Sequence, residues 1–361
     1  MLRQVNLTSD KTPKRALLSY LESPVQRTIS GENIYPFSNY GLAVELVRGL
    51  NQCGYLVDVI DWNASKLPKG ETYDVFVGHG GLIFDKIVKS NAVKRTVYFA
   101  SGSAAAFHNA ESAKRTKAFN KRHDTNFHPD RPVDPAEQKI YSKVDGLICL
   151  GNDTIAATFP ELKSLHHLNI AASPKAHLMF EELGRKQKHV LFFSGGGNIH
   201  KGLDLAIEAV IGTDIHLHIC TAIDPKFQAV YEQNYSPQDL ANIHWHGFVQ
   251  HNSRKFRKLI RRCQFVVLLS CSEGSPGSLI DVMQYGLIPI VTPACGLDMT
   301  GAGFIVKDIG IANIKQQLMR ATGEPRDEVR SRAQMTRELV EKDYSLAVFN
   351  QSLRRGLKKI I

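Results

Sequence analysis

One stretch in the second half of the chain limits the possible folds more than any other. Its first five residues, 265–269, are all apolar and fit a strand buried on both faces of a parallel sheet. A polar, turn-rich loop follows at 272–278, and residues 279–285 have the composition of a helix that ends at Gly286. A second apolar strand, 288–291, begins directly afterwards. This order of strand, loop, helix and strand predicts an α/β fold built on parallel sheets.

The loop of this stretch has the properties of an anion-binding site. It leads into the start of a helix, where unpaired backbone N–H groups and the helix dipole attract negative charge. Glu273 lies in the loop, and Asp281 follows eight positions later on the helix. One carboxylate can reach a sugar hydroxyl and the other a ribose diol, with phosphates between them. Either acid alone is more simply a solvated surface residue, but the pair between two buried strands favours a site for a ligand that carries a sugar, phosphates and a ribose.

The residues around these two acids resemble the donor-site signature of retaining GT-B glycosyltransferases, in the large family (family four, group 1) with two acidic residues separated by seven positions. Ser275 stands where that family usually has an aromatic residue, and Asp281 replaces its second Glu. The resemblance implies that Glu273 orients the transferred sugar as a catalytic residue and that Asp281 holds the ribose. The donor-binding residues that it implies here are Glu273, Gly274, Ser275, Pro276, Gly277, Ser278 and Asp281.

A glycine-rich loop upstream adds a second match. It follows an apolar strand at 190–193 and precedes an amphipathic helix at 203–210, and its glycines allow a phosphate to approach the backbone closely. It is not a dinucleotide fingerprint, because His200 stands where a third Gly is required. It resembles the family's diphosphate loop, in which Lys201 is expected to be catalytic, but Gly196 occupies the usual position of an Arg. The ligands implied are Gly195, Gly196, Gly197 and Lys201, with Phe248 and Val249 of a later loop at the nucleotide base.

The length of 361 residues suits two Rossmann-like halves. An acceptor domain is expected over 1–182 and a donor domain over 183–342, with a polar linker at 171–188. The resemblance implies a GT-B fold, in which two doubly wound domains face a cleft and the last helix, within 343–361, crosses back to the first domain. Strands are predicted in the first half at 15–20, 56–61, 73–77, 95–99 and 146–150, helices at 40–53, 311–321, 326–342 and 346–359, and a loop at 24–38.

The acceptor side of the chain carries weaker signals. The family often has a His after an N-terminal strand, close to the transferred sugar, but Ser101 and Gly102 occupy that place. Nearby residues resemble a subgroup of surface-polysaccharide glycosyltransferases with Asn-x-Glu at a helix start, although a helix cap and a first-turn acid would explain that pair equally well. The acceptor-side candidates are His79, Ser101, Gly102, His108, Asn109 and Glu111.

The net charge is +10, and the cations gather at 114–122, 254–262 and 354–359. Such faces attract diphosphate donors, anionic membrane surfaces or polyanionic acceptors, or are only solvated. No zinc-finger spacing or aromatic RNA-binding motif accompanies them, so nucleic acid is not expected as a partner. We expect neither a membrane span nor a secretory leader, and the six scattered cysteines are interpreted as free thiols in a reducing compartment. These features predict a cytoplasmic protein that can lie peripherally at the inner membrane face.

Two histidine-rich strands raise the question of a metal. His216 and His218 share one face of a strand, and His244 with His246 repeats the pattern. Because a central parallel strand is covered on both faces, packed or hydrogen-bonded rings are the better interpretation than a zinc site. No metal and no cofactor are therefore expected, and the nucleotide sugar is regarded as a substrate.

The function implied is that of a retaining glycosyltransferase of the hexosyltransferase type, active in polysaccharide biosynthesis. The expected partners are a nucleotide-diphosphate sugar and a glycan, lipid-linked or other acceptor. Two alternatives stay open from the sequence. A non-catalytic GT-B-like nucleotide-sugar-binding or scaffold protein would explain Gly196 together with the absent N-terminal His. A nucleotide-sugar epimerase shares the architecture but needs acid–base residues that the first half does not display.

Overall fold

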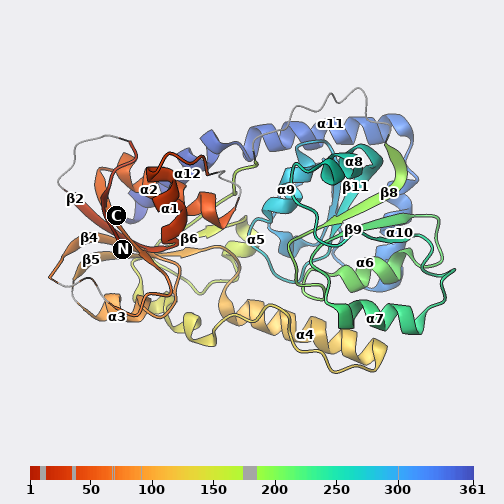
Figure 1. Ribbon diagram of the computed structural model, residues 1–361, viewed down its shortest axis with the longest axis horizontal. Coiled ribbons are helices and arrows are strands. Elements are labelled where there is room, and N and C mark those ends of the chain that lie inside the picture. The colour runs from red at the N-terminus through yellow and green to blue at the C-terminus, as the bar shows by residue number, and fades with distance from the viewer. Residues whose placement is uncertain are drawn as a thin grey trace. The chain divides into compact units, whose positions relative to one another are not determined.

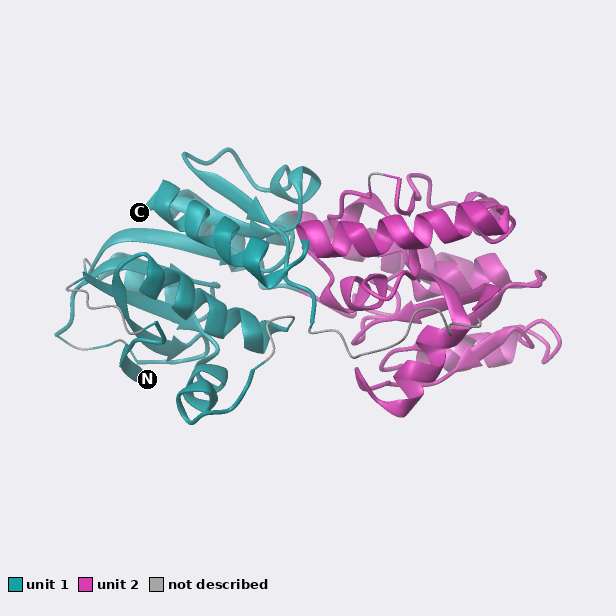
Figure 2. Ribbon diagram, turned by 90° about the horizontal axis from the view of Figure 1, so that it is seen from above, with its two compact units in different colours: residues 1–106, 133–174, 344–361 teal, residues 107–132, 175–343 magenta. Residues whose placement is uncertain are grey.

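A computed structural model describes residues 1–8, 14–34, 38–66, 68, 70–90, 92–173, 185–299 and 301–361 of the chain. Its residues form two compact units, coloured separately in Figure 2. The first unit consists of residues 1–106, 133–174 and 344–361, and the second of residues 107–132 and 175–343. Among the described helices, none is long and apolar enough to cross a membrane.

The first unit is built on a seven-stranded sheet in the order β1-β3-β2-β4-β5-β6-β7 (Figure 1). All neighbouring strands run parallel except β1, which pairs antiparallel with β3. The strand order reverses between β2 and β4, as in a doubly wound fold. The strands are β1 (Leu2–Val5), β2 (Lys14–Tyr20), β3 (Tyr55–Asp61), β4 (Tyr73–Gly78), β5 (Val93–Ala100), β6 (Gly146–Leu150) and β7 (Leu165–Leu168).

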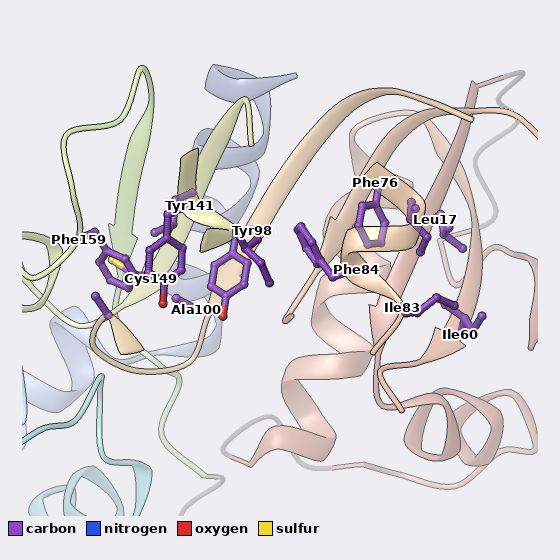
Figure 3. Packing of buried hydrophobic residues seen from close by; sticks show 14 of the residues in the cluster. Leu17, Ile60, Phe76, Ile83, Phe84, Tyr98, Ala100, Tyr141, Cys149 and Phe159 are labelled. Atoms are coloured by element: carbon purple, nitrogen blue, oxygen red, sulfur yellow. The ribbon is translucent and has the colours of Figure 1, made fainter. Parts of the chain in front are cut away.

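Aromatic side chains fill much of the core of the first unit (Figure 3). The ring of Phe84 lies 4.9 Å from that of Phe76 and 5.7 Å from that of Tyr98. Tyr141 then contacts both Tyr98 and Phe159, with ring centroids 5.2 Å apart in each pair. Aromatic pairs of this kind add to the stabilisation from buried area, so this cluster helps to hold the elements of the first unit together.

The helices of the first unit come from both ends of the chain. Helix α12 packs on α2, β6 and β7, so the C-terminal residues return to the first unit as predicted. Helix α1 lies in the segment for which the sequence predicted a loop, and that prediction is wrong. The helices are α1 (Glu22–Ile29), α2 (Asn39–Gln52), α3 (Phe84–Lys89), α5 (Asp153–Ala156) and α12 (Leu346–Ile360).

The second unit has a six-stranded, fully parallel sheet in the order β10-β9-β8-β11-β12-β13. This is the Rossmann order, and it reverses between β8 and β11. In such sheets, ligands bind beyond the carboxyl ends of the two strands at the reversal, so the loops after β8 and β11 are the expected site. The strands are β8 (Lys186–Phe193), β9 (His216–Cys220), β10 (Ile243–Trp245), β11 (Cys263–Leu268), β12 (Ile288–Val291) and β13 (Phe304–Ile305).

The helices of the second unit include one that the sequence placed elsewhere. Residues 107–132, which carry most of α4, were expected in the first domain but belong to the second unit. Residues 186–188, expected in a linker, are the first residues of β8, while 174–184 lie outside the described residues. The helices are α4 (Ala105–His123), α6 (Leu203–Val210), α7 (Pro225–Asn234), α8 (Arg254–Arg262), α9 (Gly277–Met283), α10 (Ile311–Thr322) and α11 (Arg326–Asp343).

Candidate functional site

The glycine loop after β8 is shaped by two close approaches. Gly202 is the N-cap of α6 with φ of +74°, and a Cβ there would lie 2.7 Å from the Cβ of Leu269. Gly197 has φ of +82°, and a Cβ there would lie 2.6 Å from the Cδ of Arg131. Only glycine combines this left-handed backbone with so little space. The loop is therefore held between the end of β11 and the segment that follows α4.

Lys201 and Glu273 form a buried ion pair at this point of the sheet. The Lys201 ammonium donates to Oε1 of Glu273, and the two side chains are only 9% and 12% exposed. The Ser270 hydroxyl donates to the same oxygen at 2.8 Å. Burial alone would raise the pKa of Glu273, but the charge and hydrogen bond of Lys201, together with the nearby basic groups of His200 and Arg131, outweigh it and bring the pKa down to about 2. The carboxylate is thus ionised at neutral pH, and the charge of Lys201 is already balanced.

Two histidines whose rings contact each other at a tilt lie beside this pair. The rings of His108 and His200 are 4.7 Å apart, and both contact Ser272. His200 Nε2 donates to the Ser272 carbonyl at 2.7 Å, and His108 Nε2 donates to the Arg131 carbonyl at 2.6 Å. Burial lowers the pKa of both rings, that of His200 to about 3, so both are neutral near pH 7. Their hydrogen bonds join the loops after β8 and β11 to residues 107–132.

Asp281, the residue predicted to bind the ribose, is less accessible to a ligand than the sequence implied. Asp281 lies on α9 and is only 2% exposed, and its Oδ2 is 3.7 Å from Nε2 of His251. Burial lowers the pKa of His251 to about 4, so the ring is neutral. Phe248, in the loop after β10, is 68% exposed, whereas its neighbour Val249 is buried. The loop therefore presents one large apolar ring to solvent and anchors itself through the next residue.

The remaining predicted donor residues line the turn between β11 and α9. This turn contains Gly274, Ser275 and Pro276, and Pro276 is the N-cap of α9, which begins at Gly277. Ser275 is buried, and Ser278 lies in the first turn of the helix. The structure thus places all of these residues within the loop and first turn that follow Glu273.

The acceptor-side candidates divide between the two units. His79 and Ser101 follow β4 and β5 in the first unit, where His79 Nδ1 donates to the Phe99 carbonyl at 2.7 Å and its Nε2 lies 3.4 Å from the Ser101 hydroxyl. Gly102 follows Ser101 in the same unit. His108, Asn109 and Glu111 belong to the second unit, on α4. Because α4 begins at Ala105, Asn109 lies inside the helix, so the interpretation of Asn109 as a helix cap is wrong.

Several residues of the site carried no signal in the sequence. Arg131, Ser270 and His251 lie outside the recognised motifs, and their roles depend on contacts between distant segments. Ser272 belongs to the predicted loop, but its contact with His108 could not be predicted from it. In the sequence, His200 stands out only because it interrupts a glycine pattern. That its ring is neutral and hydrogen-bonded follows from the burial of the loop, which the sequence does not show.

Histidines from three neighbouring strands stack on one another. His189 Nδ1 is 2.8 Å from His218 Nε2, and His218 Nδ1 is 3.0 Å from His246 Nε2. His216 and His244 form a similar pair at 3.0 Å. The predicted hydrogen-bonded packing is therefore confirmed, and each N···N bond requires a neutral ring. Within the described part of the chain, no cluster of three or more His, Cys, Asp or Glu side chains could hold a metal ion.

Comparison with solved structures defines the class of fold. Sucrose-phosphate synthase from Thermosynechococcus elongatus matches with a TM-score of 0.63 at 12% identity, over 97% of this chain and 99% of that chain. Anabaena HepE in complex with UDP-glucose matches with a TM-score of 0.58 at 11% identity, over 96% of this chain and 99% of that chain. TarM matches with a TM-score of 0.55 at 14% identity, over 79% of this chain. The match covers 54% of TarM, so this chain spans about half the length of that protein. These likenesses confirm the predicted GT-B fold.

Residues 175–325 match the family model described as Glycosyl transferases group 1. The match falls in the second unit, which holds Lys201 and Glu273, so this unit is similar to the group 1 glycosyl transferases and the predicted resemblance is confirmed. No curated protein matches the chain.

Proposed function

We propose that this protein transfers a sugar from a nucleotide-diphosphate sugar to a glycan, lipid-linked or other acceptor, with retention of the anomeric configuration. The observation that carries the proposal is the buried pair of Lys201 and Glu273. The two residues come from the loops after β8 and β11, where the strand order of the second sheet reverses. The match of this unit to the group 1 glycosyl transferases supports the same assignment.

The chemistry follows from where negative charge develops. As the sugar leaves, the departing nucleoside diphosphate gains charge, which is stabilised by Lys201 and by backbone N–H groups of residues 195–197, 275, 277 and 278. Glu273, ionised because its pKa is about 2, accepts hydrogen bonds from hydroxyls of the sugar and orients it. No protein nucleophile is assigned, since the front-face mechanism attributed to the family needs none. The proposal also requires no metal or cofactor.

The nucleoside is assigned to the other side of the loop after β11. Asp281 accepts hydrogen bonds from the ribose, which requires the ring of His251 to move away from the carboxylate. The exposed ring of Phe248 stacks on the base, beside the backbone of Val249. The structure of HepE in complex with UDP-glucose supports a nucleotide sugar as the donor, although neither the base nor the sugar follows from this chain.

On the acceptor side, we assign His79, Ser101 and Gly102 from the first unit and His108, Asn109 and Glu111 from the second.

The cations near the C-terminus suggest how a cytoplasmic enzyme could reach an acceptor in a membrane. In the C-terminal part of α12, Leu353, Leu357 and Ile360 are buried in the first unit, so residues 352–360 can meet an anionic leaflet only through their cations. Any membrane contact of this segment is therefore peripheral and electrostatic. WaaG, a glycosyltransferase involved in lipopolysaccharide biosynthesis, has a similar fold, with a TM-score of 0.56 at 16% identity over 96% of this chain and 99% of that chain.

The proposal is tested by screening nucleotide sugars for thermal stabilisation and then analysing the products with and without acceptor. A transferase releases nucleoside diphosphate at a rate that rises when a suitable acceptor glycan is added. An epimerase converts the donor without any acceptor, and a scaffold protein binds the donor and leaves it unchanged. Either of the last two results would overturn the proposal.

A further inference from the structure

An arginine from outside the glycine loop lies directly against it. The side chain of Arg131 passes so close to Gly197 that a Cβ at that glycine would lie 2.6 Å from the arginine Cδ. Its charge also reaches the site, because it adds to the larger effects of Lys201 and His200 in lowering the pKa of Glu273. Arg131 is far from the loop in sequence but belongs to the same compact unit.

The charges already present make this arginine important. A nucleoside diphosphate is an anion, yet the loop cation Lys201 is engaged by the carboxylate of Glu273. That pair is neutral overall, so by itself it offers a diphosphate little net attraction. Within the described residues, the guanidinium of Arg131 forms no hydrogen bond or ion pair with another side chain, and Arg131 is exposed. It is therefore a cation beside the glycine loop whose guanidinium is not engaged directly by another side chain.

The backbone around Arg131 is fixed to the site. The carbonyl of Arg131 accepts a hydrogen bond from His108 at 2.6 Å, and His108 in turn contacts Ser272 in the loop after β11. The preceding residue, Asp130, accepts a hydrogen bond from the backbone N–H of Ile199 at 3.1 Å. Because both contacts involve the loops of the candidate site, the backbone that carries the Arg131 side chain starts from a defined position and need not be ordered on binding.

We infer that Arg131 binds the diphosphate of the donor, supplying the cation that the loop itself lacks at Gly196. The inference rests on the proposed function, since it assigns a ligand to the same site. A guanidinium can donate two parallel hydrogen bonds to phosphate oxygens, and unlike Lys201 it need not first leave a carboxylate. Arg131 would therefore contribute to the affinity for the phosphates and not to that for the nucleoside.

Calorimetry with the nucleoside diphosphate that binds wild type most tightly, and with its parent nucleoside, tests this inference. Arg131→Gln should weaken diphosphate binding by about 10- to 100-fold, in the range of charge-assisted hydrogen bonds, and leave nucleoside binding unchanged. Arg131→Lys should recover part of the loss. Lys117→Gln is the matched control, because it removes one exposed cation from α4 of the same segment and should change neither affinity.

The possible outcomes separate the inference from the function on which it rests. Equal diphosphate affinity of wild type and Arg131→Gln would overturn the role of Arg131 while leaving the proposed function intact. Equal losses for diphosphate and nucleoside would show that the residue only maintains the fold of the loop, and would also overturn it. Failure of wild type to bind any nucleoside diphosphate would overturn the proposed function and the inference together.

Discussion

Replacement of Gly202 by alanine is expected to destabilise the second unit by about 2–5 kcal/mol. The left-handed backbone of Gly202, with φ of +74°, costs a non-glycine residue about 1–2 kcal/mol. The new Cβ would also lie 2.7 Å from the Cβ of Leu269 and closer still to its carbonyl oxygen. Leu269 is fully buried, so the overlap cannot be relieved by a side-chain rotation and adds about 1–3 kcal/mol.

Two other glycines provide matched controls for the two contributions. Gly247 has a similar φ of +68° but nothing within 4 Å of a Cβ, so Gly247→Ala should cost only the backbone contribution of about 1–2 kcal/mol. Gly195 lies in the same loop as Gly202, with open space at its Cβ and no left-handed φ. Gly195→Ala should change the free energy of unfolding by no more than about 0.5 kcal/mol.

Urea unfolding followed by tryptophan fluorescence measures these differences. The chain has two tryptophans, Trp62 in the first unit and Trp245 in the second, so a Trp62→Phe background makes the signal specific to the second unit. From most to least stable, the expected order of the variants is Gly195→Ala, Gly247→Ala and Gly202→Ala. If Gly202→Ala is no more destabilising than Gly247→Ala, the glycine loop does not approach the end of β11 as described.

Three further outcomes are expected together. Asp281→Ala should weaken both nucleoside diphosphate and intact donor, whereas Glu273→Ala should spare the nucleoside diphosphate and lose turnover; equal effects on the bare nucleotide would refute this division. Because burial lowers the folded-state pKa of His200 and His218 to about 3, both rings gain protons on unfolding below pH 6.5. Each should therefore remove about 1.6 kcal/mol of unfolding free energy between pH 6.5 and 5, and a flat profile in urea unfolding would contradict their burial. Replacing the four tail cations (Arg354, Arg355, Lys358 and Lys359) by Gln should reduce salt-sensitive sedimentation with anionic vesicles, and absence of wild-type binding at low salt would exclude a membrane role for them.

The second unit could be predicted closely from the sequence because its elements are apolar runs bounded by glycines. Helix 203–210 and strand 288–291 have the predicted bounds. The start of β8 was missed, since residues 186–188 are polar and extend beyond the buried part of the strand. Helix α1 was missed because Pro24 suggested a loop, yet proline is tolerated in the first turn of a helix, where its missing N–H has no intrahelical partner.

The position of residues 107–132 could not be predicted, because it depends on ion pairs between distant segments. Arg122 binds Asp204 at 2.6 Å and Glu208 at 2.9 Å, both on α6, and Arg115 donates to the Leu269 carbonyl at 2.9 Å. Local patterning contains no information about such partners. The sequence therefore assigned this segment to the first domain on the basis of chain order alone.

The candidate site shows the same division between local and long-range information. The loops that hold Lys201 and Glu273 could be predicted, since strand, loop and helix follow one another in each case. The pairing of these two side chains and the approach of Arg131 depend on how separate segments pack. A single cation was thus expected at the diphosphate loop, whereas the structure provides a neutral pair and a separate guanidinium.

The central claim is that the loops after β8 and β11 bind the diphosphate of the donor. A crystal structure of the full chain with its tightest nucleoside diphosphate tests this most directly. The phosphate oxygens should lie about 3 Å from backbone nitrogens of residues 195–197 and from the Arg131 guanidinium. A diphosphate bound elsewhere, such as in the basic cavity of about 930 Å³ lined by Arg185, Lys188 and Arg337 near the starts of β8 and β9, would contradict the claim.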